Sequence, residues 1–369
     1  MTKRNYGIEL LRILSMTMIV ILHILRWGGV LDHLAPGSLG QHLGQILQVA
    51  TFCCVNCFAL TSGYVMCQSK SRLSRFLRLW LQVLFYSFGF LAVFALLRPE
   101  ALHMGALKET FLPISMRQYW YISAYMGMYV LVPVLNTAIK GLDKKAFLGV
   151  LLGGFALFSV LATFPGKDVF GLRAGESMIW LCLMYLLGGY LKKYEVAEKI
   201  KATTGLWIYL GAVAVTYGSK LLIGFAGTLL LGRQVYGDML IQTVSPTVVA
   251  AGLGLFLFCA KLPIGEKPGR VIGFFAAGSL GAYLIHVNVF VWENWMADGF
   301  VFLANWHPAL MVLGILGFGI TIYLVCALVD IGRESLFRLV RLNLLCQKIE
   351  TLVAKLTDKL LREKEPAGK

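Results

Sequence analysis

Three ionisable side chains interrupt an apolar stretch near the N-terminus, "GIELLRILSMTMIVILHIL", which runs from Gly7 to Leu25. On an α-helix, eleven residues return to within about 20° of the starting direction, so Arg12 and His23 share one face, about 16 Å apart along the axis. Glu9, three residues before Arg12, lies on the same face, where the two side chains can pair. A guanidinium binds anions, and an imidazole exchanges protons near neutral pH. The spacing therefore predicts a site that binds an anion at Arg12 and exchanges a proton at His23. The alternative is that Glu9 and Arg12 form a structural pair and that His23 caps the end of the helix.

The elements that carry these residues are membrane-spanning helices. Of 369 residues, 58% are hydrophobic and only 14% are charged, and the mean hydropathy is +0.73. A span needs about 20 apolar residues, and the chain contains ten candidates. The composition therefore predicts an all-α polytopic protein in a lipid bilayer. The plasma membrane is the expected location. The expected spans are 8–25, 46–66, 76–97, 119–139, 146–164, 176–191, 204–223, 239–260, 271–292 and 309–330.

The positive charges predict how the chain is oriented. Of 34 Lys and Arg residues, 25 fall in the N-terminus, the C-terminal tail and alternate short loops, whereas eight fall in the intervening loops and one, Arg12, lies inside a span. Cytoplasmic segments of membrane proteins are enriched in Lys and Arg, so both termini are expected in the cytoplasm. The net charge of +15 therefore reports topology, and we expect no nucleic-acid partner.

Two other features have ordinary interpretations. The N-terminal apolar run is too long for the core of a signal peptide and lacks a small-residue cleavage site, so we expect it to be a retained span. The sequence "CCVNC" has the C-x-x-C spacing of a redox or zinc pair in Cys54 and Cys57. Because it lies in an apolar run without a second ligand pair, we interpret Cys53, Cys54 and Cys57 as buried hydrophobic residues.

The stretch from Leu221 to Asp238 either extends the seventh span or forms a re-entrant segment.

The residues of the first span also match a known family. The sequence resembles the acyltransferase-3 family of integral membrane acyltransferases, whose first span carries Arg or Lys, ten residues, and then His, as Arg12 and His23 do here. The resemblance covers residues 5–330. Further family-like stretches appear in order: "FALTSGYVM" with Ser62, Gly63 and Tyr64; "KSRLSRFLRLW" with Arg72, Arg75 and Arg78; "YWYISAYMGMYVLVPVLN" with Trp120, Tyr121, Tyr129 and Pro133; "YLLGGYLKKY"; and "SLGAYLIHVNVF" with Ser279, Tyr283 and His286.

The resemblance implies transfer of an acyl group, usually acetyl, from cytoplasmic acyl-CoA to a hydroxyl of a cell-envelope carbohydrate or glycolipid. Acyl-CoA is a donor substrate, and no bound cofactor is expected. The arginines Arg72, Arg75 and Arg78 have the chemistry to bind the phosphates of CoA through charge-assisted hydrogen bonds. Basic residues in a cytoplasmic loop are also expected for topology and for contact with anionic lipid, so that alternative stays open.

Two histidines are candidates for the reaction itself. His23 and His286 each lie fifteen residues beyond the expected inner end of their spans, so both are placed about 22 Å from the inner edge, where they can share a cavity. His23 is the candidate base or the residue that is transiently acylated. Arg12 is expected near the donor, and Ser279 and Tyr283 share a helix face with His286, where they can orient His23 or the acceptor. A satisfied core histidine is the alternative for His286.

The remaining candidates have supporting roles. Ser62 and Tyr64 belong to the family-like end of the second span, and Glu9 accompanies Arg12. Aromatic residues near span ends are expected to form interfacial belts, with sugar stacking as the alternative; these are Trp120, Tyr121, Trp180, Trp292, Trp295 and Trp306. No metal site is predicted, because the loop histidines lack metal-like spacing; these are His33, His42, His103 and His307.

The chain is expected to divide into a transmembrane bundle, residues 5–330, and a basic tail, residues 331–369. Apolar residues recur at three- and four-residue spacing in the tail, which predicts an amphipathic helix on the inner leaflet or a self-association helix. The main alternative to an acyltransferase is a transporter or flippase of an envelope precursor, and a sensor is a third. Transporters often contain internal repeats, and the pattern of Arg12 and His23 occurs only once. A separate extracytoplasmic partner for the transfer also remains open.

Overall fold

The computed structural model describes residues 4–164, 168–232 and 237–364. Helices, and no strands, form the regular structure of these ranges. Lys3, Lys167, Arg233 and Lys369, which contribute to the charge asymmetry, lie outside the described residues.

The all-α polytopic prediction is confirmed, because eight described helical stretches are long and apolar enough to cross a membrane. Their helices are α1 (Tyr6–Arg26), α2 (Leu39–Thr51) followed by α3 (Cys54–Met66), α4 (Leu73–Leu97), α6 (Trp120–Gly141), α7 (Lys144–Phe155), α11 (Ala202–Leu231), α13 (Glu266–Ala277) followed by α14 (Ser279–His286), and α16 (Pro308–Leu339). The other α-helices are α5 (Met104–Phe111), α8 (Leu161–Thr163), α9 (Met178–Lys193), α10 (Val196–Lys199), α12 (Pro246–Ala260), α15 (Val289–Val291) and α17 (Leu342–Lys364).

Two of the ten expected spans are short helices. The segments 176–191 and 239–260 correspond to α9, with 16 residues, and α12, with 15 residues. At about 1.5 Å per residue, each is shorter than the hydrocarbon core of a bilayer. The total number of spans and the cytoplasmic location of the termini therefore stay predictions. The seventh span is longer than expected, because α11 continues as one helix to Leu231.

The helix that carries His286 is interrupted. The chain leaves α13 and enters α14 at Gly278, where an added Cβ would lie 2.7 Å from the backbone oxygen of Ala327 on α16. The interruption is one residue long, and the stretch Glu266–His286 counts as one of the eight candidate spans. The contacts of His286 with α1 are described below.

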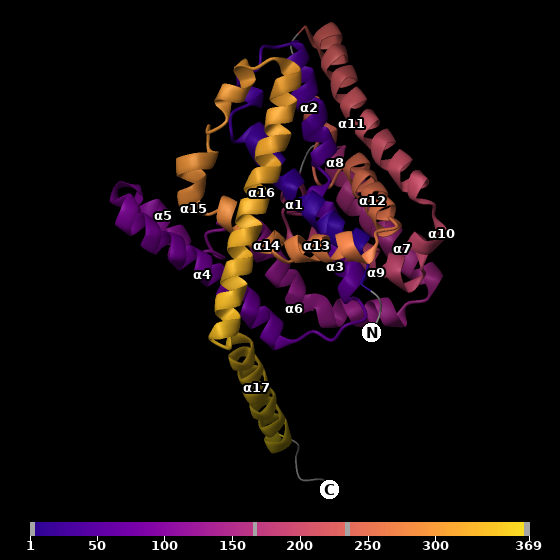
Figure 1. Ribbon diagram of the computed structural model, residues 1–369. Coiled ribbons are helices and arrows are strands. Elements are labelled where there is room, and N and C mark those ends of the chain that lie inside the picture. Colours follow the sequence, from indigo (N-terminus) through magenta and orange to yellow (C-terminus); the bar gives the residue numbers. More distant parts are fainter. Residues whose placement is uncertain (1–3, 165–167, 233–236, 365–369) are drawn as a thin grey trace.

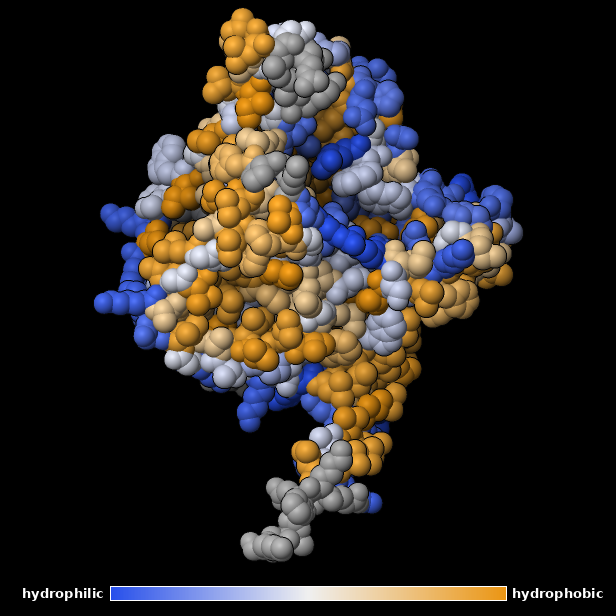
Figure 2. Space-filling model, turned by 180° about the vertical axis from the view of Figure 1, so that it is seen from behind, coloured by the Kyte–Doolittle hydropathy of each residue, from blue (hydrophilic) through white to orange (hydrophobic). Residues whose placement is uncertain are grey.

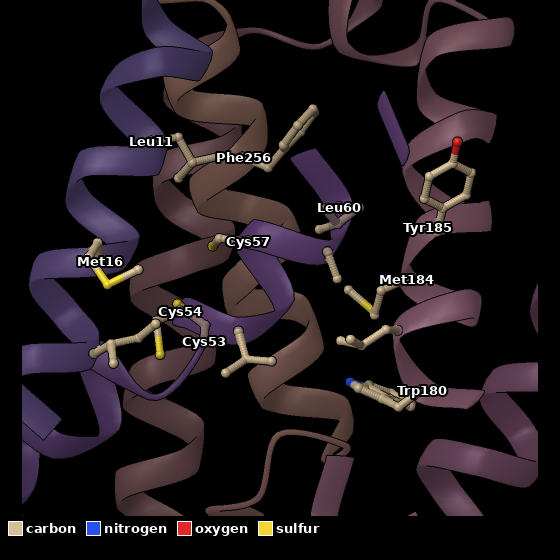
Figure 3. Packing of buried hydrophobic residues seen from close by; sticks show 14 of the residues in the cluster. Leu11, Met16, Cys53, Cys54, Cys57, Leu60, Trp180, Met184, Tyr185 and Phe256 are labelled. Atoms are coloured by element: carbon tan, nitrogen blue, oxygen red, sulfur yellow. The ribbon is translucent and has the colours of Figure 1, made fainter. Parts of the chain in front are cut away.

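The core lies between α1, α3, α9 and α12 (Figure 1). Figure 3 shows Cys53, Cys54 and Cys57 in this core among Leu11, Met16 and Phe256. The three thiols are at most 1% exposed and form no disulfide, in agreement with their interpretation as buried hydrophobic residues. The belt interpretation is wrong for Trp180, which is fully buried on α9 and donates from Nε1 to Asn56 Oδ1 at 2.9 Å.

The outer surface is largely hydrophobic, as expected of a protein surrounded by lipid (Figure 2). The long helices α11 and α16 lie on the outside of the bundle (Figure 1). Much of the apolar surface of α11 is exposed, including Trp207, Phe225 and Leu229. In a bilayer such a face meets lipid tails, so exposure of large apolar side chains there is expected.

The tail is helical, as predicted. The expected boundary at residue 330 lies inside α16, which continues to Leu339. After Arg341, whose φ is 52°, α17 projects away from the bundle (Figure 1) and presents a hydrophobic face (Figure 2). Within α17, Glu350 accepts a hydrogen bond from the backbone N–H of Leu73, the first residue of α4, at 3.0 Å. The tail therefore contacts the helix that carries Arg75 and Arg78.

The crossing of α3 and α9 depends on two glycines. A Cβ added at Gly188 would collide with the backbone oxygen of Leu60, and one added at Gly63 with that of Tyr185. We expect Gly188→Ala to separate the helices and destabilise the protein by about 1–3 kcal/mol, measured as a lower Tm in detergent. Gly153→Ala on α7 is the matched control, because nothing lies within 4 Å of the added methyl group. Equal Tm values for the two variants would contradict this account.

Candidate active site

His23 and His286 meet inside the bundle. The Nδ1 atom of His23, on α1, lies 3.1 Å from Nε2 of His286, the last residue of α14. His286 is 1% exposed, and its Nδ1 lies 2.6 Å from the backbone oxygen of Ala282, one turn earlier. The helix therefore orients the imidazole of His286, which in turn contacts His23.

These contacts define which nitrogens of the neutral rings carry protons. A carbonyl oxygen only accepts, so His286 donates from Nδ1 to Ala282, which leaves His286 Nε2 as an acceptor. His23 then donates from Nδ1 to that acceptor, and its own Nε2 keeps a free lone pair. When His23 takes up a second proton, the hydrogen bond to His286 holds the ring in place. The pair thus fixes the ring of His23 with Nε2 as the nitrogen that can accept a proton, an arrangement suited to a base.

Two tryptophans pack edge-on against His23. The ring centroids of Trp27 and Trp292 lie 5.2 and 5.0 Å from that of His23, and 5.8 Å from each other. Trp27 ends α1, and Trp292 begins a short π-helix, Trp292–Met296. Aromatic walls restrict the imidazole to one orientation and limit access of water to it. Belt formation alone does not explain these two residues.

Four cavities follow one another through the bundle, and each shares lining residues with the next. A basic vestibule of about 940 Å³ meets a hydroxyl-lined cavity of about 140 Å³ at Arg12. That cavity meets a histidine cavity of about 90 Å³ at Tyr121 and Tyr283. The histidine cavity meets an acidic mouth of about 330 Å³ at His23 and Trp120. His23 therefore lies between two chambers at opposite ends of the series.

The basic vestibule contains more arginines than the sequence analysis predicts. Arg12, Arg75 and Arg78 line it as expected. Four further arginines line it from the N-terminus, α13 and the end of α16: Arg4, Arg270, Arg333 and Arg338. These additional arginines fall in segments where basic residues are expected for topology, so charge counting alone does not distinguish them.

Carboxylates hold several of these arginines in place. Glu334 lies 2.6 Å from Arg78, 2.9 Å from Arg333 and 3.5 Å from Arg338. Asp330 accepts two hydrogen bonds from Arg333, each at 3.0 Å. Seven arginines thus share two acids that line the same chamber, which leaves a strong excess of positive charge. Such a chamber attracts a ligand with several negative charges.

Asp330 has two other partners that fix it. Gln82 and Tyr86, both on α4, each donate to its Oδ1 at 2.8 Å. Asp330 is 2% exposed, and a Cβ added at Gly281 on α14 would collide with it. The network connects α4 and α16 beside the helix that carries His286. Arg333 is therefore a buried, fixed cation at the vestibule wall, and periodicity alone does not reveal it.

The expected pairing of Glu9 and Arg12 is present. Arg12 Nη1 lies 3.0 Å from Glu9 Oε2, and Arg4 Nε lies 3.0 Å from Glu9 Oε1. Glu9 bridges the two arginines, and Arg12 lines both the vestibule and the hydroxyl-lined cavity. Arg12 thus marks the passage between these chambers.

The structure brings most of the predicted supporting residues to the cavities. Ser62, Ser279, Tyr121 and Tyr283 line the hydroxyl-lined cavity, and the two tyrosines, together with Trp120, line the histidine cavity. Within the hydroxyl-lined cavity, Ser279 is fixed by a hydrogen bond of 3.2 Å to Tyr323 on α16.

Two predicted residues lie elsewhere. Arg72 caps the start of α4, where its backbone N–H and carbonyl bind the hydroxyl of Tyr129 at 3.3 and 3.1 Å, and it is outside the four cavities among the described residues. Tyr64 packs against Phe256 and lies beneath the ammonium of Lys192, 5.0 Å from the ring centre. Both contacts indicate structural positions.

The acidic mouth combines carboxyl groups with aromatic rings. Burial raises the pKa of Glu176, although Arg117, 3.3 Å away, opposes this shift. Burial and the nearby carboxylate of Glu293 raise the pKa of Glu109. Glu293 itself lies 2.8 Å from His103 Nε2. Carboxyl groups beside exposed indole rings provide hydrogen-bonding groups and stacking surfaces for a polar ligand.

The fold and these chambers define a polytopic membrane protein with a hydrogen-bonded pair of histidines in its interior. A family model described as an acyltransferase domain matches residues 5–330. The chain therefore belongs to the acyltransferase-3 family, as its motifs predict. Among curated proteins and solved structures, none matches the chain significantly.

The contact between the histidines makes His286 a positioning residue. We expect His286→Ala to lower kcat for acyl transfer by about 100-fold with a smaller change in KM, because His23 Nδ1 loses its acceptor. His286→Gln, whose amide oxygen can accept the same hydrogen bond, should retain more activity than His286→Ala. Transfer is measured in membranes and normalised to protein content. Equal losses in both variants would show that packing, and not this hydrogen bond, determines the effect.

Proposed function

We propose that this protein transfers a short acyl group, acetyl in particular, from acyl-CoA in the cytoplasm to a hydroxyl of a cell-envelope carbohydrate or glycolipid. The observation that carries the proposal is the position of His23, oriented by His286, between a basic chamber and an acidic, aromatic one. The plasma membrane is the proposed location, with the basic vestibule on its cytoplasmic side. Acyl-CoA acts as substrate, and no bound cofactor is required.

The basic vestibule has the charge to bind the donor. CoA carries several phosphate charges, and guanidinium groups bind phosphate oxygens in bidentate, charge-assisted pairs. Arg75 faces the vestibule and forms no ion pair among the described side chains, so it is available for a phosphate. Arg12, at the next passage, lies where the thioester arm would leave the vestibule.

In the proposed reaction, the acceptor hydroxyl enters through the acidic mouth and approaches His23 Nε2. The imidazole removes the hydroxyl proton while the oxygen attacks the thioester carbonyl. The tetrahedral intermediate collapses, the C–S bond breaks, and His23 returns the proton to the departing thiolate. Acyl ester and free CoA result. Transient acylation of His23 is the alternative chemistry, and trapping of an acyl-imidazole would establish it.

The size of the histidine cavity supports a short acyl group. Its volume of about 90 Å³ is below the roughly 150 Å³ of a cavity that holds a benzene ring. An acetyl group fits, whereas a long acyl chain requires its walls to move. The same narrowness argues against the transporter or flippase alternative, because a hexose is larger than benzene and would not pass this point without a large opening.

The role of His23 is tested by His23→Ala. We expect loss of transfer from labelled acetyl-CoA, because no other described group occupies the position of the base, while the protein still inserts and accumulates. His42→Ala is the control, since His42 contacts Tyr217 on α11, with Nδ1 2.7 Å from the hydroxyl, away from the four cavities. Full transfer by His23→Ala would overturn the proposed role.

A second experiment identifies the acceptor. It compares the ester content of envelope polysaccharide between a deletion strain and its parent.

The donor site is tested by Arg75→Glu. Reversal of one charge in the vestibule should raise the KM for acyl-CoA by about 10-fold or more, with a smaller change in kcat, because phosphate contacts bind the donor before the reaction. Lys145→Glu, at an exposed position in the first turn of α7, is the matched control and should leave KM unchanged. If Arg75→Glu also leaves KM unchanged, this arginine serves topology only.

A further inference from the structure

One side chain in the hydroxyl-lined cavity lacks a hydrogen-bond partner. Thr61, on α3, is 5% exposed and lines the cavity, yet its Oγ1 has no partner within the protein. Buried polar atoms are nearly always paired, and each exception needs a reason. A ligand that occupies the cavity is a direct source of a partner.

The unpaired Oγ1 of Thr61 differs from other hydroxyl groups on the helices of this protein. Serine and threonine in helices usually donate to the carbonyl four residues earlier. Ser62, the next residue, does so to Phe58 at 3.0 Å, and Thr110 does so to Ala106 at 2.8 Å. Thr61 does not form this bond, so its hydroxyl remains available to the cavity. The local helix therefore leaves a donor and an acceptor unused at this position.

The rest of the cavity wall indicates which chemistry would use them. Arg12 lies at one end and Tyr283 at the other. The hydroxyl of Tyr125 contacts Met66 Sδ at 3.8 Å and the side chain of Ser62. The rest of the lining is apolar and consists of Met16, Ile19, Phe58, Leu79, Ile122 and Leu280. A fatty chain would leave the Thr61 hydroxyl unpaired, whereas a linear chain of methylene groups and amides matches both the apolar and the polar groups of the lining.

We propose that the Thr61 hydroxyl hydrogen-bonds an amide of the pantetheine arm of the acyl donor. This inference rests on the proposed function, because the arm must pass from the phosphates in the vestibule to the thioester beside His23. The hydroxyl-lined cavity joins those two chambers. Thr61 then discriminates donors by the amide of the arm, independently of the nucleotide and of the acyl group.

The experiment compares Thr61→Val, which keeps the shape and removes the hydroxyl, with Thr61→Ser, which keeps the hydroxyl. Donors are acetyl-CoA, S-acetyl-pantetheine and an S-acetyl alkyl thioester without amides. We expect Thr61→Val to raise KM about three- to tenfold for both amide donors, the effect of one hydrogen bond, with kcat nearly unchanged. The alkyl thioester should not distinguish the variants. Thr61→Ser should resemble wild type, as should the control Thr137→Val, whose hydroxyl donates to Pro133.

A binding measurement separates this inference from the proposed function. Without ligand, Thr61→Val should have a higher Tm than wild type, because it removes an unpaired buried hydroxyl, and CoA should raise its Tm less than it raises that of wild type. If CoA protects both proteins equally and KM is unchanged, the role of Thr61 is overturned while donor binding stands. If wild type neither binds CoA nor transfers acetyl, the proposed function fails, and this inference fails with it.

Discussion

A protonatable group inside a membrane must be paired or must face a cavity, because hydrocarbon cannot replace the hydrogen bonds that the group makes with water. The structure meets this constraint at His23 by placing His286 against one nitrogen and a cavity against the rest of the ring. His286 is the last residue of α14, and its Nδ1 donates to the backbone oxygen of Ala282. The end of this helix therefore orients His286 and holds it against His23 on α1.

The same constraint shapes the basic vestibule. Seven arginines around one chamber repel one another, and the protein reduces that repulsion with Glu9, Glu334 and Asp330. Asp330 is in turn satisfied by Gln82 and Tyr86. The compensation is incomplete, so the chamber keeps an excess of positive charge. Because Arg78 and Arg333 share Glu334, a phosphate that binds there competes with an internal carboxylate.

Much of this arrangement could be predicted from the sequence. Hydropathy alone predicts a helical membrane bundle, and the helical period alone places Glu9 beside Arg12. The equal spacing of His23 and His286 from the expected inner ends of their spans places both histidines at one depth, and the structure brings them into contact. Periodicity does not predict Arg333, since buried and solvated arginines look alike in a sequence when they follow a span. The belt pattern fails for Trp180, because an indole near a helix end fits that pattern even when it is buried and donates to Asn56.

The narrowness of the two central cavities has a consequence for how the reaction is divided. In the proposed reaction, each substrate presents only its reacting end at His23, because a nucleotide or a sugar is larger than the space there. The bulky parts then stay in two chambers that differ in chemistry, with guanidinium groups at one end and carboxyl and indole groups at the other. Helix α1 lines both chambers, through Arg12 at one and His23 at the other, so the chambers share one helix and differ in the groups that their other helices and loops contribute.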